Sequence, residues 1–376
     1  MGGVGLLNRV VDPFWYYRDV AIEGFNAVKT KFRRFERHVK PAILARERPE
    51  AVTLGSSLTE VGFDPLNPAF TDHGRLTGFN FAVAAAQWQI IQCYFKYAIG
   101  HAPIKRAVVE VRPMDLADAD CAVPEAALDI ATPAQLLFST RALKASIETI
   151  QGQGKERPSH TREGQYFYAR YDPGVESRFR EILGRRLKKG QCDLAALRQG
   201  VSAALLPMKD GPMRQLDLSG LRKVVRIARA KGIELRLVVH PRHAYDYEMD
   251  ALCPAAIDQW DVLRQMASVV HEASGGDDRI QLWAFVGYDT ITGEPVSANM
   301  KLWQDPLHLN FEIGDIMLNA MFGRPSPGSP NIGRRVFPEN VDAIRRDFLE
   351  GRESFIKANP WFYPGLRTLL SQGRGS

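Results

Sequence analysis

Residues 51–65 read Ala-Val-Thr-Leu-Gly-Ser-Ser-Leu-Thr-Glu-Val-Gly-Phe-Asp-Pro. The apolar, β-branched start of this stretch predicts a short buried strand that ends at Gly55 in a tight turn. If a helix begins at the two serines, Ser57 lies at its N-terminus. Unpaired backbone N–H groups there favour a nucleophilic oxygen and the oxyanion that it creates. The alternative is that Ser56 or Ser57 only caps the helix.

Strands and helices alternate along most of the chain. Further strands are predicted at 78–83, 107–111, 234–240 and 280–286, and helices at 87–99, 216–231 and 255–272. This alternation predicts an α/β fold with a mainly parallel five-stranded sheet. Residues 116–212 interrupt it with predicted helices at 133–150, 175–187 and 194–206, which we interpret as a helical insertion. The predicted domains are a helical segment at 1–48, an α/β domain at 49–323 and a helical extension at 324–376.

Polar residues follow the predicted strands. Ser57 follows the first strand, Arg112 the third, a His-Pro-Arg-His stretch ending at His243 the fourth, and a loop with Asp305 and His308 the fifth. In open α/β sheets, ligands bind outside the carboxyl ends of the strands. We therefore expect these groups at one edge of the sheet, where they suit acyl-transfer chemistry.

The pair Asp305 and His308 lies about 250 residues after Ser57. With 43 acidic residues and 8 histidines in the chain, an acid three positions before a histidine is expected about once by chance. The value of the spacing is geometric, because it can bring the carboxylate to Nδ1–H of the imidazole and turn Nε2 toward a serine. The alternative for Asp305 is a helix N-cap, which Pro306 at the next position favours.

Two blocks carry a family resemblance. Gly55-Ser56-Ser57-Leu58-Thr59 and the late Asp-x-x-His block together resemble the SGNH (GDSL-like) hydrolase superfamily. The resemblance implies a three-layer α/β/α sandwich of the SGNH or flavodoxin-like type. It also implies a nucleophile at Ser57, an acid at Asp305 and a base at His308, with no cofactor and no metal.

More narrowly, the chain is similar to bacterial cell-envelope SGNH-like proteins. The similarity rests on Val-Gly-Phe-Asp-Pro at 61–65, Phe-Asn-Phe-Ala at 79–82, Trp-Gln-Asp-Pro-Leu-His-Leu at 303–309 and Gly-Asp at 314–315. Such proteins are often encoded with exopolysaccharide assembly and carry an N-terminal membrane anchor, and some transfer or remove O-acetyl groups. This implies a serine esterase or O-acyltransferase acting on a carbohydrate in the cell envelope or periplasm. A cytoplasmic location is the alternative.

The chain departs from the family at the oxyanion hole. The family glycine after the second strand corresponds to Ala-Ala-Ala at 84–86, and the family Gly-x-Asn corresponds to Arg-Pro-Met at 112–114. The backbone of Ala85 can still donate, and Asn80, Gln87 or Arg112 can substitute for the missing side chain. Arg112 can equally pair with Glu110. The second hypothesis is therefore a weak or inactive scaffold protein of envelope polysaccharide assembly.

Two further residues lie near the expected site. His243 is either a participant or an ordinary loop histidine. Trp303 stacks on a sugar ring or belongs to the core. Both alternatives remain open for each residue.

Composition bounds the remaining possibilities. The chain has 376 residues, a net charge of +6 and four dispersed cysteines, which we interpret as buried thiols and not as a zinc site or a disulfide scaffold. No apolar run approaches the roughly 20 residues of a membrane helix, so we expect a soluble chain, with an upstream signal or anchor left open. A basic run at residues 29–40, from Lys29 to Lys40, is either a solvated helix face or a membrane contact. No nucleic-acid partner is expected.

Overall fold

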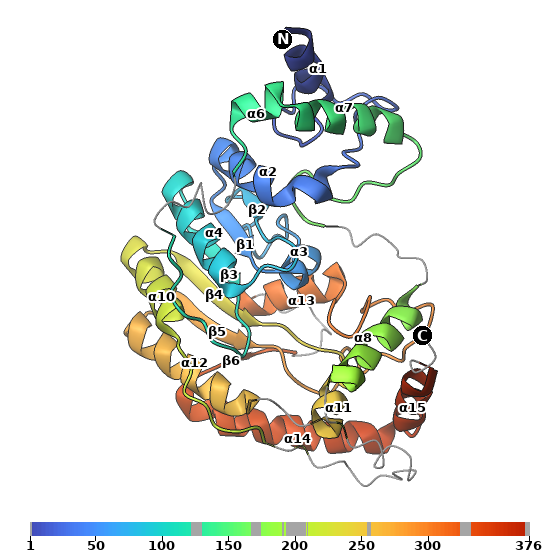
Figure 1. The fold of residues 1–376 in the computed structure, drawn as a ribbon. Helices are drawn as coiled ribbons and strands as arrows, with labels where there is room; N and C mark the ends of the chain where they lie inside the picture. The colour runs from blue at the N-terminus through green and yellow to red at the C-terminus, as the bar shows by residue number, and fades with distance from the viewer. Residues whose placement is uncertain are drawn as a thin grey trace. The chain divides into compact units, whose positions relative to one another are not determined.

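The computed structural model describes residues 2–121, 130–166, 174–189, 192, 208, 210–253, 257–323 and 332–372. The chain forms two compact units (Figure 1). The first unit consists of Met1–Val109 and Asp118–Ala169, and the second consists of Glu110–Ala117 and Arg170–Ser376. The segment 1–48 therefore belongs with the residues that follow it. The two halves of the predicted insertion belong to different units.

Within the described ranges, six strands form a sheet in the order β2-β1-β3-β4-β5-β6. β1 pairs in parallel with β2 and β3, β4 pairs in parallel with β5, and β6 is antiparallel to β5. The predicted α/β fold with a mainly parallel sheet is confirmed. The sixth strand was not predicted, because a two-residue strand carries no periodicity. The bounds are Ala51–Leu54 for β1, Gly78–Asn80 for β2, Arg106–Glu110 for β3, Glu234–Val239 for β4, Ile280–Ala284 for β5 and Arg334–Arg335 for β6.

Helices of the first unit pack on one another in two groups. α1 contacts α6 and α7, and α2 contacts α4 (Figure 1). The predicted helix at 133–150 is in fact two helices, because Ser139 ends α6 and caps α7 with its side chain. The bounds are Gly2–Val11 for α1, Phe32–Glu47 for α2, Ser57–Gly62 for α3, Trp88–His101 for α4, Pro133–Phe138 for α6 and Thr140–Gly152 for α7.

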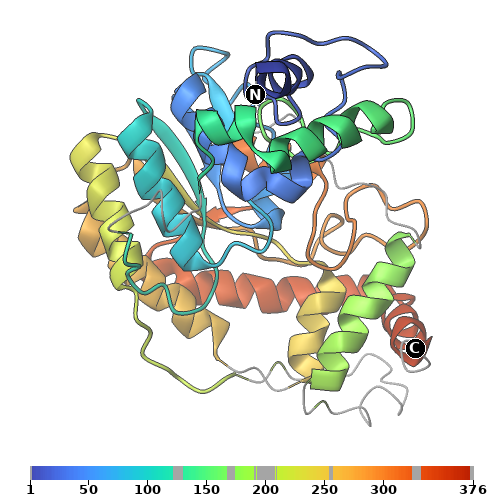
Figure 2. The same cartoon turned by 45° about the horizontal axis from the view of Figure 1, so that its top comes forward.

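In the second unit, α10 contacts β4 and β5, and α12 contacts β5. α10 contacts α12, α12 contacts α14, and α8 contacts both α11 and α15. Figure 2 shows α8 in light green beside α15 in dark red. The predicted helix at 194–206 lies outside the described residues. The bounds are Val175–Lys189 for α8, Ser219–Lys231 for α10, Ala244–Leu252 for α11, Gln259–Ser274 for α12, Phe311–Met321 for α13, Val341–Ala358 for α14 and Phe362–Gln372 for α15.

All four cysteines are paired in disulfides. Cys93 bonds Cys121 within the first unit, and Cys192 bonds Cys253 within the second. The prediction of buried thiols is therefore wrong. The reason is that partners 28 and 61 positions apart leave no local pattern that identifies them as pairs.

The basic run at residues 29–40 is directed largely into the first unit. Lys29 is buried and donates to the carbonyl oxygen of Val11 at 2.8 Å. Lys40 is fully buried, and Arg34 is the exposed cation of the run. A solvated basic face is thus wrong for most of this segment, and most of the charge that the membrane-contact hypothesis requires is already used internally. Among the described residues, no helix combines the length and apolar character that a bilayer span requires.

Candidate functional site

The serine turn after β1 has the predicted strand-to-helix form. Ser56 is buried at the N-cap of α3, and its Oγ accepts a hydrogen bond from the backbone N–H of Leu58 at 3.3 Å. Ser57 is the first helical residue and is partly exposed. The capping role thus belongs to Ser56. The hydroxyl of Ser57 is the one whose position suits a nucleophile.

The loop after β2 runs beside this turn. The backbone N–H of Val83 donates to the carbonyl oxygen of Gly55 at 3.1 Å. Ala85, at the exposed tip of the loop, has a φ of 51°. This left-handed region ordinarily favours glycine. An alanine therefore adopts a glycine-like conformation where the family resemblance expects the oxyanion-hole glycine.

The two amide side chains near this loop differ in their surroundings. Asn80 is fully buried, and its amide nitrogen donates to the carbonyl oxygens of Thr59, Glu60 and Phe63. Its Oδ1 accepts from the backbone N–H of Ala82 at 3.2 Å. Asn80 is therefore occupied in holding α3 to the loop and is a poor oxyanion donor. Gln87 is exposed at the N-cap position of α4.

The predicted carboxylate–imidazole contact is present in the second unit. Nδ1–H of His308 donates to Oδ2 of Asp305 at 2.7 Å, and Asp305 is only 1% exposed. Oδ1 of Asp305 accepts from the backbone N–H groups of Leu307 and His308. Burial alone would raise the pKa of Asp305, but these hydrogen bonds outweigh it and lower the pKa. Asp305 therefore stays ionised and fixes the tautomer that leaves Nε2 of His308 as a base.

The loop that carries this pair is a tight turn anchored in the core. The backbones of Trp303 and Leu309 form an isolated antiparallel β-bridge. The indole N–H of Trp303 donates to the carbonyl oxygen of Ile291 at 2.7 Å. Trp303 is fully buried, so it is a core residue and not a platform for a sugar. Asp305 is not a helix N-cap, because α13 begins only at Phe311.

His243 is a structural residue of the same region. Its Nδ1 accepts from the backbone N–H of Tyr245 at the start of α11, and its Nε2–H donates to the carbonyl oxygen of Glu294 at 2.8 Å. Burial lowers the pKa of His243 to about 4, so the ring is neutral. Its backbone N–H donates to the carbonyl oxygen of Pro306. His243 thus supports the Asp305 loop and does not act as a base.

The sequence does not identify Arg178 as a neighbour of the pair, and it places His240 after the fourth strand without assigning it a role. Nη1 of Arg178, on α8, lies 3.8 Å from Oδ2 of Asp305. His240, buried after β4, has its pKa lowered to about 4 by burial, with further lowering from Arg112 and His308 and an opposing effect of Glu110. Of the two alternatives for Arg112, the ion pair with Glu110 is present, with Nε of Arg112 2.7 Å from Oε1 of Glu110. Nothing local in the sequence marks Arg178, because its partner is 127 positions away along the chain.

One buried cluster of the first unit has the residue types of a metal site. Glu36, Glu60 and His160 bring their ligand atoms within 4.8 Å of one another. Arg33 already contacts both carboxylates, at 2.7 and 2.5 Å, and Lys40 contacts Glu60 at 2.8 Å. Two cations thus balance the two carboxylates. The cluster is therefore an internal ion-pair network and a poor site for a further cation.

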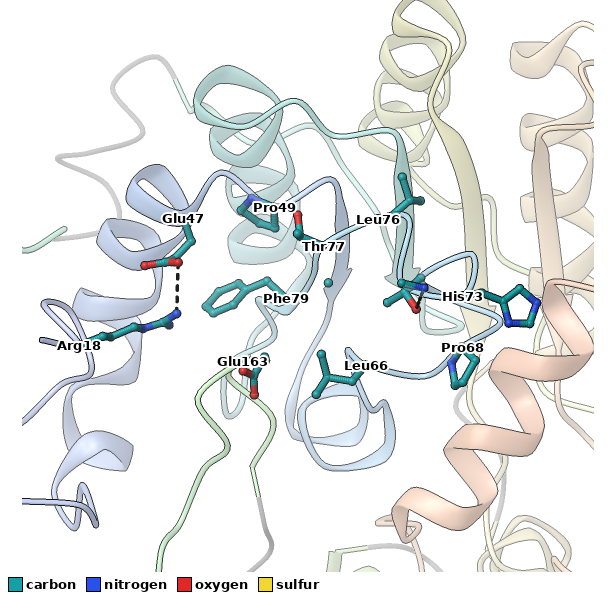
Figure 3. A pocket seen from close by; sticks show the side chains of 13 residues that line it. Arg18, Glu47, Pro49, Leu66, Pro68, His73, Leu76, Thr77, Phe79 and Glu163 are labelled. Atoms are coloured by element: carbon teal, nitrogen blue, oxygen red, sulfur yellow. Dashed lines mark hydrogen bonds and ion pairs between the residues drawn. The ribbon is translucent and has the colours of Figure 1, made fainter. Parts of the chain in front are cut away.

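A cavity of about 570 Å³ lies at the other end of the strands of the first unit (Figure 3). Pro49 lies before β1, and Thr77 and Gly78 lie at the start of β2, so this cavity is remote from the serine turn along both strands. Its walls include the ion pair between Arg18 and Glu47. None of the residues predicted for the site lines it.

Comparisons with protein-family models, with curated proteins and with solved structures gave no match to this chain.

Proposed function

We propose that this protein is a serine-dependent ester hydrolase or O-acyltransferase that acts on an O-acylated, in particular O-acetylated, carbohydrate. The observation that carries the proposal is the buried contact between Asp305 and His308 at 2.7 Å. An ionised carboxylate that holds Nδ1–H leaves Nε2 as a base of the kind that activates a serine. Ser57 is the proposed nucleophile, since Ser56 supplies the helix cap.

In the proposed reaction, Oγ of Ser57 attacks the carbonyl carbon of the ester and passes its proton to Nε2 of His308. The tetrahedral intermediate then collapses, and His308 returns the proton to the departing sugar oxygen. Water or a second sugar hydroxyl next attacks the acyl-serine and gives its proton to His308, and Ser57 recovers it as the acyl group leaves. The backbone N–H of Ala85 is the proposed donor to the oxyanion.

The proposal includes the finer fold, a three-layer α/β/α sandwich of the SGNH type, and a location in the cell envelope. The two disulfides support that location over the cytoplasmic alternative. Disulfides form and persist in oxidising compartments such as the periplasm and are rare in the cytosol.

A second candidate function is a carbohydrate-binding scaffold that keeps the fold and turns over slowly or not at all. The observation in its favour is that two side chains considered as oxyanion donors are already engaged with other groups. Asn80 is engaged with three carbonyl oxygens, and Arg112 is paired with Glu110. The loss of one oxyanion donor typically costs about 100- to 1000-fold in turnover.

Covalent labelling with a fluorophosphonate distinguishes the two functions. The reagent phosphonylates an activated serine with loss of fluoride, and mass spectrometry of peptides locates the adduct. We expect an adduct on Ser57 in the wild-type protein. The rate of labelling of the whole protein should be at least about 1000-fold lower in Ser57→Ala. The matched control is Ser56→Ala, which should still be labelled although loss of the cap lowers its free energy of unfolding by about 1 kcal/mol. Equal labelling of wild type and Ser57→Ala, or of neither, favours the scaffold.

A further inference from the structure

Side chains of α2 clamp the backbone of the loop after β2. Oε1 of Glu36 accepts from the backbone N–H of Ala84 at 2.8 Å, and Arg37 donates to the carbonyl oxygen of the same residue at 2.5 Å. Lys40 donates to the carbonyl oxygen of Ala82, also at 2.5 Å. Both polar backbone groups of Ala84, the residue just before the tip at Ala85, are thus bonded to one helix.

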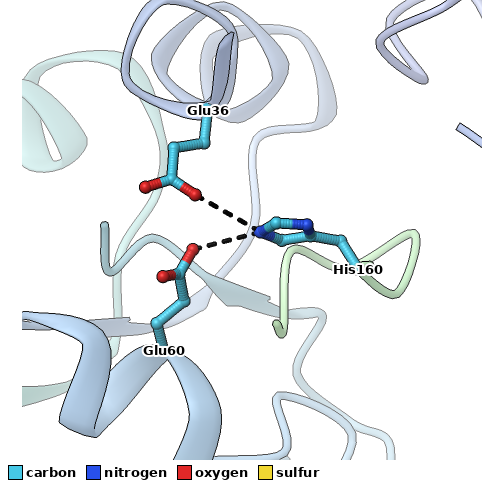
Figure 4. Close-up of side chains that lie close together, drawn as sticks. All are labelled: Glu36, Glu60 and His160. Atoms are coloured by element: carbon cyan, nitrogen blue, oxygen red, sulfur yellow. Dashed lines mark hydrogen bonds and ion pairs between the residues drawn. The ribbon is translucent and has the colours of Figure 1, made fainter. Parts of the chain in front are cut away.

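The clamp is itself held by buried charges. Lys40 also contacts Glu60 of α3 at 2.8 Å, and Nε2–H of His160 donates to Glu60 at 3.2 Å. Figure 4 shows Glu36 and Glu60 converging on His160 from two different helices. Burial alone would raise the pKa of Glu60, but Lys40, His160 and Arg33 outweigh it and lower the pKa. The network therefore links α2, α3 and the loop after β2 through ionised groups.

Such a network is an inefficient way to gain stability. A buried ion pair can often be replaced by apolar residues at no cost in stability, because desolvation offsets much of the attraction. What it does provide is fixed geometry. Ala85 has a φ of 51° without being glycine, and a residue in this region persists only where its surroundings over-determine it. The bonds to Ala82 and Ala84 supply that constraint immediately before the strained residue.

The clamped loop is also bonded to the serine turn. Val83, which lies between the two clamped residues, donates its N–H to Gly55. Glu60, which binds Lys40, lies in the first turn of the helix that Ser57 begins. Displacement of the loop relative to α2 would therefore change where its N–H groups lie relative to Ser57.

We propose that Glu36, Arg37 and Lys40 are positioning residues of the acyl-transfer site, which hold the Ala85 loop so that its backbone N–H meets the oxyanion formed at Ser57. This inference rests on the proposed function. It gives the basic run at residues 29–40 a role inside the molecule in place of a membrane contact.

The test compares Arg37→Met with Arg34→Met, which removes an exposed cation from the same helix. A displacement of about 1 Å at an active site can cost about 100-fold in rate. We therefore expect Arg37→Met to lower kcat for an aryl acetate by about 10- to 100-fold with KM changed less than about 2-fold. Arg34→Met should match the wild type, and Arg37→Lys should recover part of the rate. A kcat of Arg37→Met equal to that of the wild type would overturn the inference.

A second measurement does not depend on activity. Hydrogen–deuterium exchange of the peptide that spans residues 82–87 should be faster in Arg37→Met than in the wild type and unchanged in Arg34→Met. Exchange in α4 should be the same in all three proteins. If the wild type proves unreactive toward esters and fluorophosphonates, the proposed function fails, while exchange still tests the clamp. Unchanged exchange of the 82–87 peptide in Arg37→Met would contradict the clamp whatever the activity.

Discussion

Ala85 shows how a single residue can carry the conformation of an absent glycine. A left-handed φ of 51° costs an alanine about 1 kcal/mol relative to glycine. The same residue is the proposed oxyanion donor through its backbone, so the identity of its side chain is secondary to the direction of its N–H. The strained backbone of Ala85 directly follows Ala84, which hydrogen bonds from α2 hold in place.

Replacement of Ala85 by glycine should therefore relieve strain. We expect Ala85→Gly to change the free energy of unfolding by between about 0 and +1 kcal/mol, because the gain in the folded state is partly offset by the freedom that glycine adds to the unfolded chain. The control is Ala84→Gly, at a residue without a positive φ, which should lose about 0.5–1 kcal/mol. Urea denaturation measures both. An equal loss in the two variants would mean that Ala85 is not strained.

At the residue scale, the sequence predicts local contacts well and distant ones poorly. Asp305 and His308 meet as expected because three positions place them in one turn. Sequence did not settle the burial of Trp303 or the use of both ring nitrogens of His243. Ile291 is 12 positions from Trp303 along the chain, and Glu294 is 51 positions from His243. Only packing decides between a core residue and a site residue there.

At the scale of elements, α11 depends on a histidine as its N-cap. His243 accepts from the backbone N–H of Tyr245 only through an unprotonated Nδ1. Burial lowers the pKa of His243 from 6.5 to about 4. In the unfolded chain the ring takes up a proton near pH 6.5, whereas in the folded chain it does so only near pH 4. This cap therefore contributes stability above pH 6.5 that is lost as the pH falls toward 4.

The pH dependence of unfolding should reveal this cap. Between pH 7 and pH 4.5 we expect the wild type to lose more stability than His243→Asn, by up to about 3 kcal/mol, since one pKa unit corresponds to about 1.4 kcal/mol. Asparagine keeps an N-cap acceptor and does not titrate in this range. Urea titrations at the two pH values give the difference. An identical pH dependence in both proteins would show that the pKa of His243 is the same in the folded and unfolded states.

Element positions follow from the sequence wherever one local pattern dominates. β1 begins and ends where the apolar run predicts, at Ala51 and Leu54. The burial of the basic side chains of α2 does not follow from the sequence. These cations pair with Glu60 and with a carboxylate on α2 itself, and they donate to carbonyl oxygens of the loop after β2. Glu60 and that loop are 20 or more positions from Lys40 along the chain. The helical periodicity of residues 29–40 contains no information about partners at that distance.

At the scale of the whole molecule, the chain divides into two compact units. Ser57 and the Ala85 loop belong to the first unit, and Asp305 and His308 belong to the second. That these groups lie at one edge of the sheet stays a prediction from the sequence, based on the rule that the carboxyl ends of parallel strands meet at the same edge. Each disulfide joins two cysteines of the same unit. No comparable rule predicts this pairing from the sequence.

The central claim is that Ser57 transfers its proton to His308, and thiol titration tests it most directly. All four native cysteines are in disulfides, so Ser57→Cys introduces the only free thiol. The rate of its alkylation by iodoacetamide, followed by intact mass against pH, reports the pKa of that thiol. An adjacent imidazolium lowers a thiol pKa well below its ordinary value of about 8.5.

We predict a lowered thiol pKa in Ser57→Cys and a return toward about 8.5 in Ser57→Cys/His308→Ala. The control Ser57→Cys/His271→Ala, which removes an exposed histidine of α12, should behave like the single variant. The same alkylation profile in Ser57→Cys with and without His308 would contradict the proposed proton transfer.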